Sequence, residues 1–167
     1  LAYSSISHLG WMTITLIYNP KLTLLAFYLY CLMTTTIFLT LNTTKTLKLS
    51  TMVTAWTKIP SLTAAFMLTL LSLAGLPPFT GFLPKWLIIQ ELTKQEMTPT
   101  ATIIALLSLL GLFFYLRLAY CATITLPPNS TNYMKLWQTN KPVSILTTTF
   151  TVLTLMLLPL SPMALTI

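Results

Sequence analysis

Charged side chains are scarce in this chain. Only 7% of its 167 residues are Asp, Glu, Lys or Arg, and only two of these are acidic. A water-soluble domain usually carries about 25% charged residues, so this shortage excludes an ordinary soluble surface. The hydrophobic fraction of 55% and the mean hydropathy of +0.81 predict a membrane protein instead.

Motifs that bind metals or nucleotides are also missing. Cys31 and Cys121 lie inside apolar runs, and no CxxC or His/Cys ligand spacing is present, so a zinc or iron–sulfur site is unsupported. The sequence holds neither GxGxxG nor GxxxxGK[ST], so no nucleotide cradle is expected. The two cysteines are expected to be small buried thiols.

The positive net charge does not indicate nucleic-acid binding. The charge is +7, but the basic residues are scattered through short polar segments between apolar runs and form no basic face. Most of them fall in two segments, 42–59 and 127–141. The positive-inside rule predicts that these loops lie on the cytoplasmic or matrix side of the membrane.

Long apolar runs predict an all-α membrane domain over residues 1–167 with about five transmembrane helices, one of them discontinuous. A span needs about 20 residues. The first run begins at Leu1, which is not Met, so we expect an N-terminal part of the natural chain to be missing. The predicted spans are 1–17, 22–41, 60–94 with a break at 75–83, 99–126 and 142–167.

The third span is interrupted by Gly75, Pro77, Pro78, Gly81 and Pro84. Its two halves are together too long for one straight helix, and proline breaks a helix interior. Irregular backbone at membrane depth survives only where it is buried in protein or lines a cavity. The pattern therefore predicts a broken helix with an internal site beside it.

Lys85 directly follows this break. Holding a lone ammonium in a bilayer costs roughly 3 kcal/mol on insertion scales. Two interpretations are open: a lysine that gains and loses a proton, or an interfacial lysine that extends to the headgroups beside Trp86. The break favours the first, because a lipid-facing anchor does not require a broken helix.

Three further polar residues are candidates. His8 is the single histidine; it either relays protons, with Ser4 on the same helix face, or only packs helices. Glu91 either exchanges a proton with Lys85 or, as we favour, is a solvated carboxylate on the exit side. Arg117 is expected to have a structural role, pairing with a carboxylate of a neighbouring subunit or with lipid headgroups.

Two of these segments resemble a known family. Residues 1–10, with His8, resemble the histidine-bearing helix of the antiporter-like membrane subunits of respiratory complex I. Residues 75–86, with Lys85, resemble the discontinuous helix of their second repeat. The Phe114-Tyr115-Leu116-Arg117 stretch and the length are also similar to a member of this family.

The resemblance implies a fold of inverted repeats, of which this chain carries most of the second. It also implies proton translocation coupled to electron transfer from NADH to ubiquinone, with Lys85 and His8 on the proton path. NADH, FMN, iron–sulfur clusters and ubiquinone would be bound by other subunits, and no cofactor by this chain.

Partners and location follow from the same resemblance. The expected partners are other membrane-arm subunits and lipids such as cardiolipin. The Thr, Leu and Met bias is similar to that of an animal mitochondrial genome, which indicates the inner mitochondrial membrane. A scaffolding subunit without its own proton path, and a subunit of a related cation/proton antiporter, remain as alternatives.

Overall fold

The computed structural model describes residues 2–44, 60–124 and 145–165 of the chain. Within these ranges the chain is helical and holds no strand, so the predicted all-α fold is confirmed. The helices are α1 (Ala2–Tyr18), α2 (Pro20–Thr44), α4 (Pro60–Ala74), α5 (Phe82–Lys94), α6 (Thr98–Ile124) and α7 (Ile145–Leu165).

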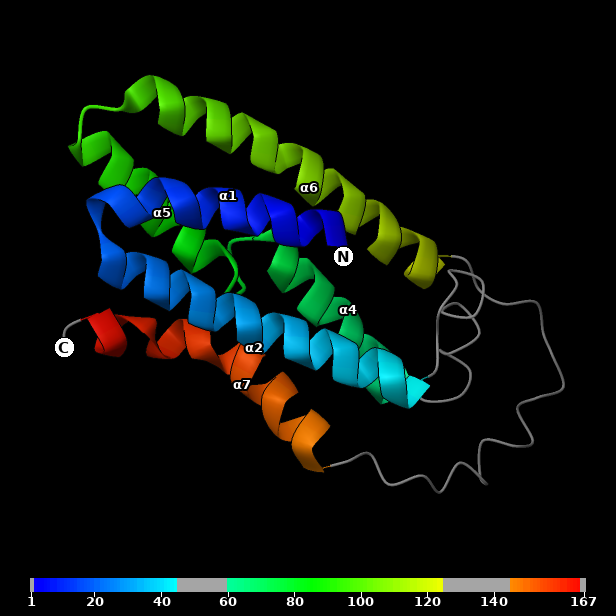
Figure 1. Cartoon of the computed structure of the whole chain (residues 1–167). Coiled ribbons are helices and arrows are strands. Elements are labelled where there is room, and N and C mark those ends of the chain that lie inside the picture. The colour runs from blue at the N-terminus through cyan, green and yellow to red at the C-terminus, as the bar shows by residue number, and fades with distance from the viewer. Residues whose placement is uncertain (1, 45–59, 125–144, 166–167) are drawn as a thin grey trace, which may run out of the picture.

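The predicted interruption of the third span separates α4 from α5. The two helices lie roughly one after the other, with a non-helical segment between them (Figure 1). Elsewhere the boundaries differ in detail: α2 is longer at both ends than the predicted range 22–41. It begins at Pro20 because proline fits the first turn of a helix, where its missing N–H is not needed.

Helix α2 is the central element of the bundle. It packs against α1, α4, α5 and α7. Its side chains Met33 and Ile37 are at most 2% exposed, and they meet Leu73 of α4 and Tyr115 of α6 in the larger hydrophobic cluster. In a bilayer, such close packing stabilises the bundle mainly by van der Waals contact, because lipid tails are as apolar as the side chains.

A second cluster fixes the position of α5. Ile88 and Leu92 of α5 are buried against Trp11 of α1, Ala26 of α2 and Ala101 of α6. This contact holds α5 against α1, α2 and α6.

Threonine hydroxyls inside the helices are satisfied locally. Thr36 and Thr40 of α2 are almost fully buried, and each donates a hydrogen bond to the carbonyl three residues earlier in its own helix. Back-bonding of this kind makes a hydroxyl tolerable away from water. It explains how helices so rich in threonine remain compatible with a membrane.

Among the described helices, α2 and α6 are long and apolar enough to cross a membrane by length and composition. Helix α6 exposes large apolar side chains such as Leu106, Leu109 and Phe113 on the face away from the cavity described below. The prediction that both cysteines are buried is wrong for Cys121, which lies on α6 and is exposed, and Cys31 is only half-buried. The face of α6 that carries Cys121 is thus exposed.

The predicted loops 42–59 and 127–141 lie largely outside the described residues, as does Leu1. Their placement on one side of a membrane stays a prediction from charge alone.

Candidate functional site

The break between α4 and α5 is a compact turn over residues 75–81. Gly75 has a positive φ of 85°, which side-chain-bearing residues rarely adopt. The amides of Gly75 and Phe79 donate to the carbonyls of Ser72 and Leu76, at 2.9 and 3.0 Å, so the chain is hydrogen-bonded as it turns. Pro77 and Pro78 lie in the turn and Pro84 lies in the first turn of α5.

The break is packed tightly against its neighbours. A Cβ added to Gly81 would collide with the backbone carbonyl of Ser72 in α4 and would lie 3.5 Å from Sδ of Met33 in α2. Only glycine allows two backbone segments to approach so closely. The two ends of the break, at Gly75, Thr80 and Gly81, are thus buried in protein, whereas Pro77 and Pro78 in its middle are exposed. Irregular backbone at membrane depth must be covered by protein or line a cavity.

The Lys85 side chain turns back across the break toward α4. Its Nζ donates a hydrogen bond of 2.9 Å to the carbonyl oxygen of Ala74, the last residue of α4. The last four carbonyls of a helix have no partner within the helix, and the helix dipole makes this end negative. The break therefore creates an acceptor that suits an ammonium group.

A cavity of about 590 Å³ opens next to Lys85. Helix α1 packs on α2 and α5, and α6 packs on α4 and α5; the cavity lies among α1, α4, α5 and α6. Its wall is mostly apolar, and its volume is far more than one water molecule needs. The residues with polar side-chain groups that line it include Tyr3, Ser4, Ser7, His8, Lys85, Ser108 and Tyr115.

His8 and Lys85, which are 77 residues apart in the sequence, therefore line one cavity and lie close enough to interact electrostatically. The imidazole of His8 also packs on Tyr30 of α2, with ring centroids 4.9 Å apart and a 34° angle between the planes. The residue thus combines a packing contact with access to the cavity. Ser4, one turn earlier in α1, lines the same cavity.

Tyr115 is a polar residue of this site that the sequence analysis did not single out. It is 3% exposed, and it lines the cavity together with Ser4. In the sequence it follows Phe113 and Phe114, and this aromatic run predicts only packing. The one available signal was the hydroxyl itself, because a buried tyrosine usually needs a hydrogen-bond partner.

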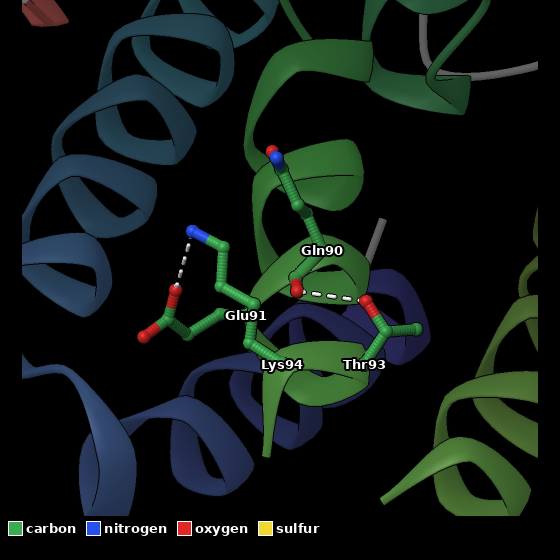
Figure 2. Close-up of polar contacts among 4 residues, drawn as sticks. All are labelled: Gln90, Glu91, Thr93 and Lys94. Carbon is green, nitrogen blue, oxygen red and sulfur yellow. Dashed lines mark hydrogen bonds and ion pairs between the residues drawn. The ribbon is translucent and has the colours of Figure 1, made fainter. Parts of the chain in front are cut away.

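Glu91 is not among the residues that line this cavity. It lies further along α5, where its Oε2 is 3.7 Å from Nζ of Lys94, a side chain that is 63% exposed (Figure 2). The same view shows the Thr93 hydroxyl, which donates to the carbonyl of Gln90 at 2.8 Å. The structure does not bring Glu91 to Lys85, and this geometry favours the exit-side interpretation.

Arg117 is also outside the cavity. Its side chain is exposed on α6, close to the exposed aromatic residues Phe113, Phe114 and Tyr120. Metal binding has no support in the described ranges, because they hold no cluster of three His, Cys, Asp or Glu residues.

Comparison with known proteins gives two family matches. Residues 1–111 match the model described as "NADH:quinone oxidoreductase/Mrp antiporter, TM", and residues 112–165 match the model described as "NADH dehydrogenase subunit 2 C-terminus". The first match includes α1, the break, Lys85 and His8. The second includes Tyr115 and Arg117.

Individual relatives agree with these matches. Proteins named NADH-ubiquinone oxidoreductase chain 2 from Struthio camelus, Coturnix japonica and Gallus gallus are 73%, 68% and 68% identical to this chain. The alignments cover 99%, 100% and 99% of the chain, but only 48% of each relative. The chain thus spans about half the length of the curated relatives it matches.

Proposed function

The chain belongs to the NADH:quinone oxidoreductase/Mrp antiporter family, and from this membership we propose that it is part of a membrane subunit of respiratory complex I that translocates protons. Electron transfer from NADH to ubiquinone would drive this translocation. The names of the relatives favour this function over that of a cation/proton antiporter subunit.

One observation carries the proposal. The Lys85 ammonium lies on the free carbonyl of Ala74 at the helix break, and it shares a cavity with His8. Within the described residues, the Lys85 ammonium has one carbonyl partner and no carboxylate partner. Little therefore compensates the cost of burying its charge. Such a group is suited to gain and lose a proton as its surroundings change.

In this proposal Lys85 takes up a proton, and water in the cavity passes it to or from His8. Imidazole suits this step because its unperturbed pKa, about 6.5, is near physiological pH. Glu91 has at most an accessory role at the exit of the path, where it lies beside Lys94. Redox cofactors, namely NADH, FMN, iron–sulfur clusters and ubiquinone, would be held by other subunits of the complex.

The proposal also includes location and partners. The complex would lie in the inner mitochondrial membrane, with the loops 42–59 and 127–141 on the matrix side. Neighbouring antiporter-like subunits and lipids such as cardiolipin would cover the exposed apolar face of α6. The exposed Arg117 would meet a carboxylate or a lipid phosphate there.

The test is Lys85→Met in the assembled complex, with Lys94→Met as the matched control on the same helix. Removing a positioned proton-transfer group typically costs roughly 10²-fold or more in rate. We therefore expect fewer protons translocated per NADH oxidised with Lys85→Met, and an unchanged number with Lys94→Met. Both would be measured in proteoliposomes that contain the complete complex.

An unchanged proton number with Lys85→Met would contradict the proposal. It would favour the scaffolding function instead, in which this chain fills space between pumping subunits and Lys85 only stabilises the end of α4.

A further inference from the structure

Thr80 lies in the break and makes a hydrogen bond that differs from those of most other threonines described. Its hydroxyl donates to the backbone carbonyl of Thr154 in α7 at 2.8 Å, and both residues are 2% exposed. Thr36 and Thr69 instead donate to carbonyls three residues earlier in their own helices. The hydroxyl of Thr80 therefore connects two parts of the fold, the break and α7.

The bond requires a close match between the break and α7. A carbonyl oxygen has two lone pairs, so the carbonyl of Thr154 accepts this bond in addition to one within α7. A buried hydroxyl that lost its partner would have no water to replace it. The break and α7 are thus expected to keep the relative position in which this hydrogen bond forms.

The opposite side of the break is held by α4 and α2. Gly81 lies directly against the Ser72 carbonyl. The hydroxyl of Ser72 donates to the carbonyl of Thr69 at 2.7 Å and lies 3.6 Å from Sδ of Met33. Residues 80 and 81 are therefore fixed from two directions, by α7 on one side and by α4 with α2 on the other. Lys85 follows within the next turn of chain.

The hydrogen bond between Lys85 and Ala74 joins the two sides of the break. Ala74 is the last residue before the break and Lys85 lies in the first turns after it, so the distance between Nζ and the carbonyl depends on the path of residues 75–81. The path of residues 75–81 in turn depends on the contacts of residue 80, which include its hydrogen bond to α7.

We propose that Thr80 is a positioning residue for Lys85. By binding the backbone of α7, it keeps the break in the shape in which the ammonium lies on the Ala74 carbonyl and at the cavity. This inference rests on the proposed function, because it assigns Thr80 a role in the proton transfer by Lys85. It gives α7, whose described side chains do not line the cavity, a direct connection to the site.

The test compares Thr80→Val, which keeps the shape and removes the hydroxyl, with Thr80→Ser, which keeps the hydroxyl. Thr36→Val is the control, because Thr36 is equally buried but bonds only within its own helix. In proteoliposomes with the complete complex, we expect Thr80→Val to lower the protons translocated per NADH oxidised, as Lys85→Met does but by no more than that variant. Thr80→Ser and Thr36→Val should keep the wild-type value.

A double variant separates positioning from general stability. If Thr80 acts through Lys85, then Thr80→Val should cause no further fall in a Lys85→Met background. Equal losses with Thr80→Val and Thr80→Ser, or a further loss in the double variant, would overturn the inference in favour of plain packing. If valine prevents assembly of the complex, Thr80→Ala takes its place with the same expected results.

The two hypotheses fail in different ways. A wild-type proton number with Lys85→Met would remove the proposed function and the inference together. A lowered number with Lys85→Met beside a wild-type number with Thr80→Val would overturn the inference alone.

Discussion

At the scale of single residues, the site depends on glycine as much as on lysine. Gly75 adopts a positive φ, and a Cβ there would lie 2.8 Å from Nζ of Lys85. Gly81 permits contact between the break and the Ser72 carbonyl. These two positions let the chain turn inside the bundle, and the turn leaves the Ala74 carbonyl free for Lys85.

Gly81→Ala should therefore destabilise the protein. The added methyl collides with backbone, which cannot rotate away as a side chain can, and overpacking of this kind typically costs about 1–3 kcal/mol. We expect a lower yield of assembled complex and a lower melting temperature of the detergent-solubilised complex.

Gly111→Ala is the control for this prediction, because a Cβ at Gly111 meets nothing within 4 Å. It should be neutral or slightly stabilising, since alanine is a better helix former than glycine by up to about 1 kcal/mol. Equal effects of the two variants would show that the close contact at Gly81 does not exist.

At the scale of elements, α5 has two ends with different chemistry. Its first turns carry Lys85 at the cavity, whereas its last turn carries Lys94 beside Glu91 and is exposed. The middle of the helix is anchored by Ile88 and Leu92. The separation of the two lysines along one helix makes Lys94 a suitable control for Lys85.

The variant Glu91→Gln tests whether the two ends of α5 differ in function. The ion pair between Glu91 and Lys94 is partly exposed, with side-chain exposures of 22% and 63%. A pair of this kind three residues apart in a helix is worth about 0.5 kcal/mol or less, so the stability of the complex should barely change. The number of protons translocated per NADH oxidised should also stay close to wild type, because Glu91 does not line the cavity. A loss comparable to that of Lys85→Met would place Glu91 on the main path and contradict this account.

At the scale of the whole molecule, the sequence predicts the helices and the break, because both depend on local pattern. Apolar runs of sufficient length indicate spans, and Gly75 with Pro77 and Pro78 marks the interruption. That Lys85 and His8 belong to one site was inferred from family resemblance and not from any local pattern, since 77 residues separate them; in the structure both line one cavity.

What the sequence does not predict depends on how distant helices meet. The burial of Tyr115 and the bond from Thr80 to Thr154 both require the arrangement of helices that are distant in the sequence. A threonine that bonds across helices looks the same in the sequence as one that bonds within its own helix. For the same reason, Cys121 looked buried although it lies on an exposed face.

The most direct test of the central claim is a high-resolution structure of the complete complex in which ordered water is visible. The account predicts a chain of water molecules in the cavity that links Lys85 to His8, with the helix broken at Pro77 and Pro78. A dry cavity, with the Lys85 ammonium lying among lipid headgroups, would contradict it.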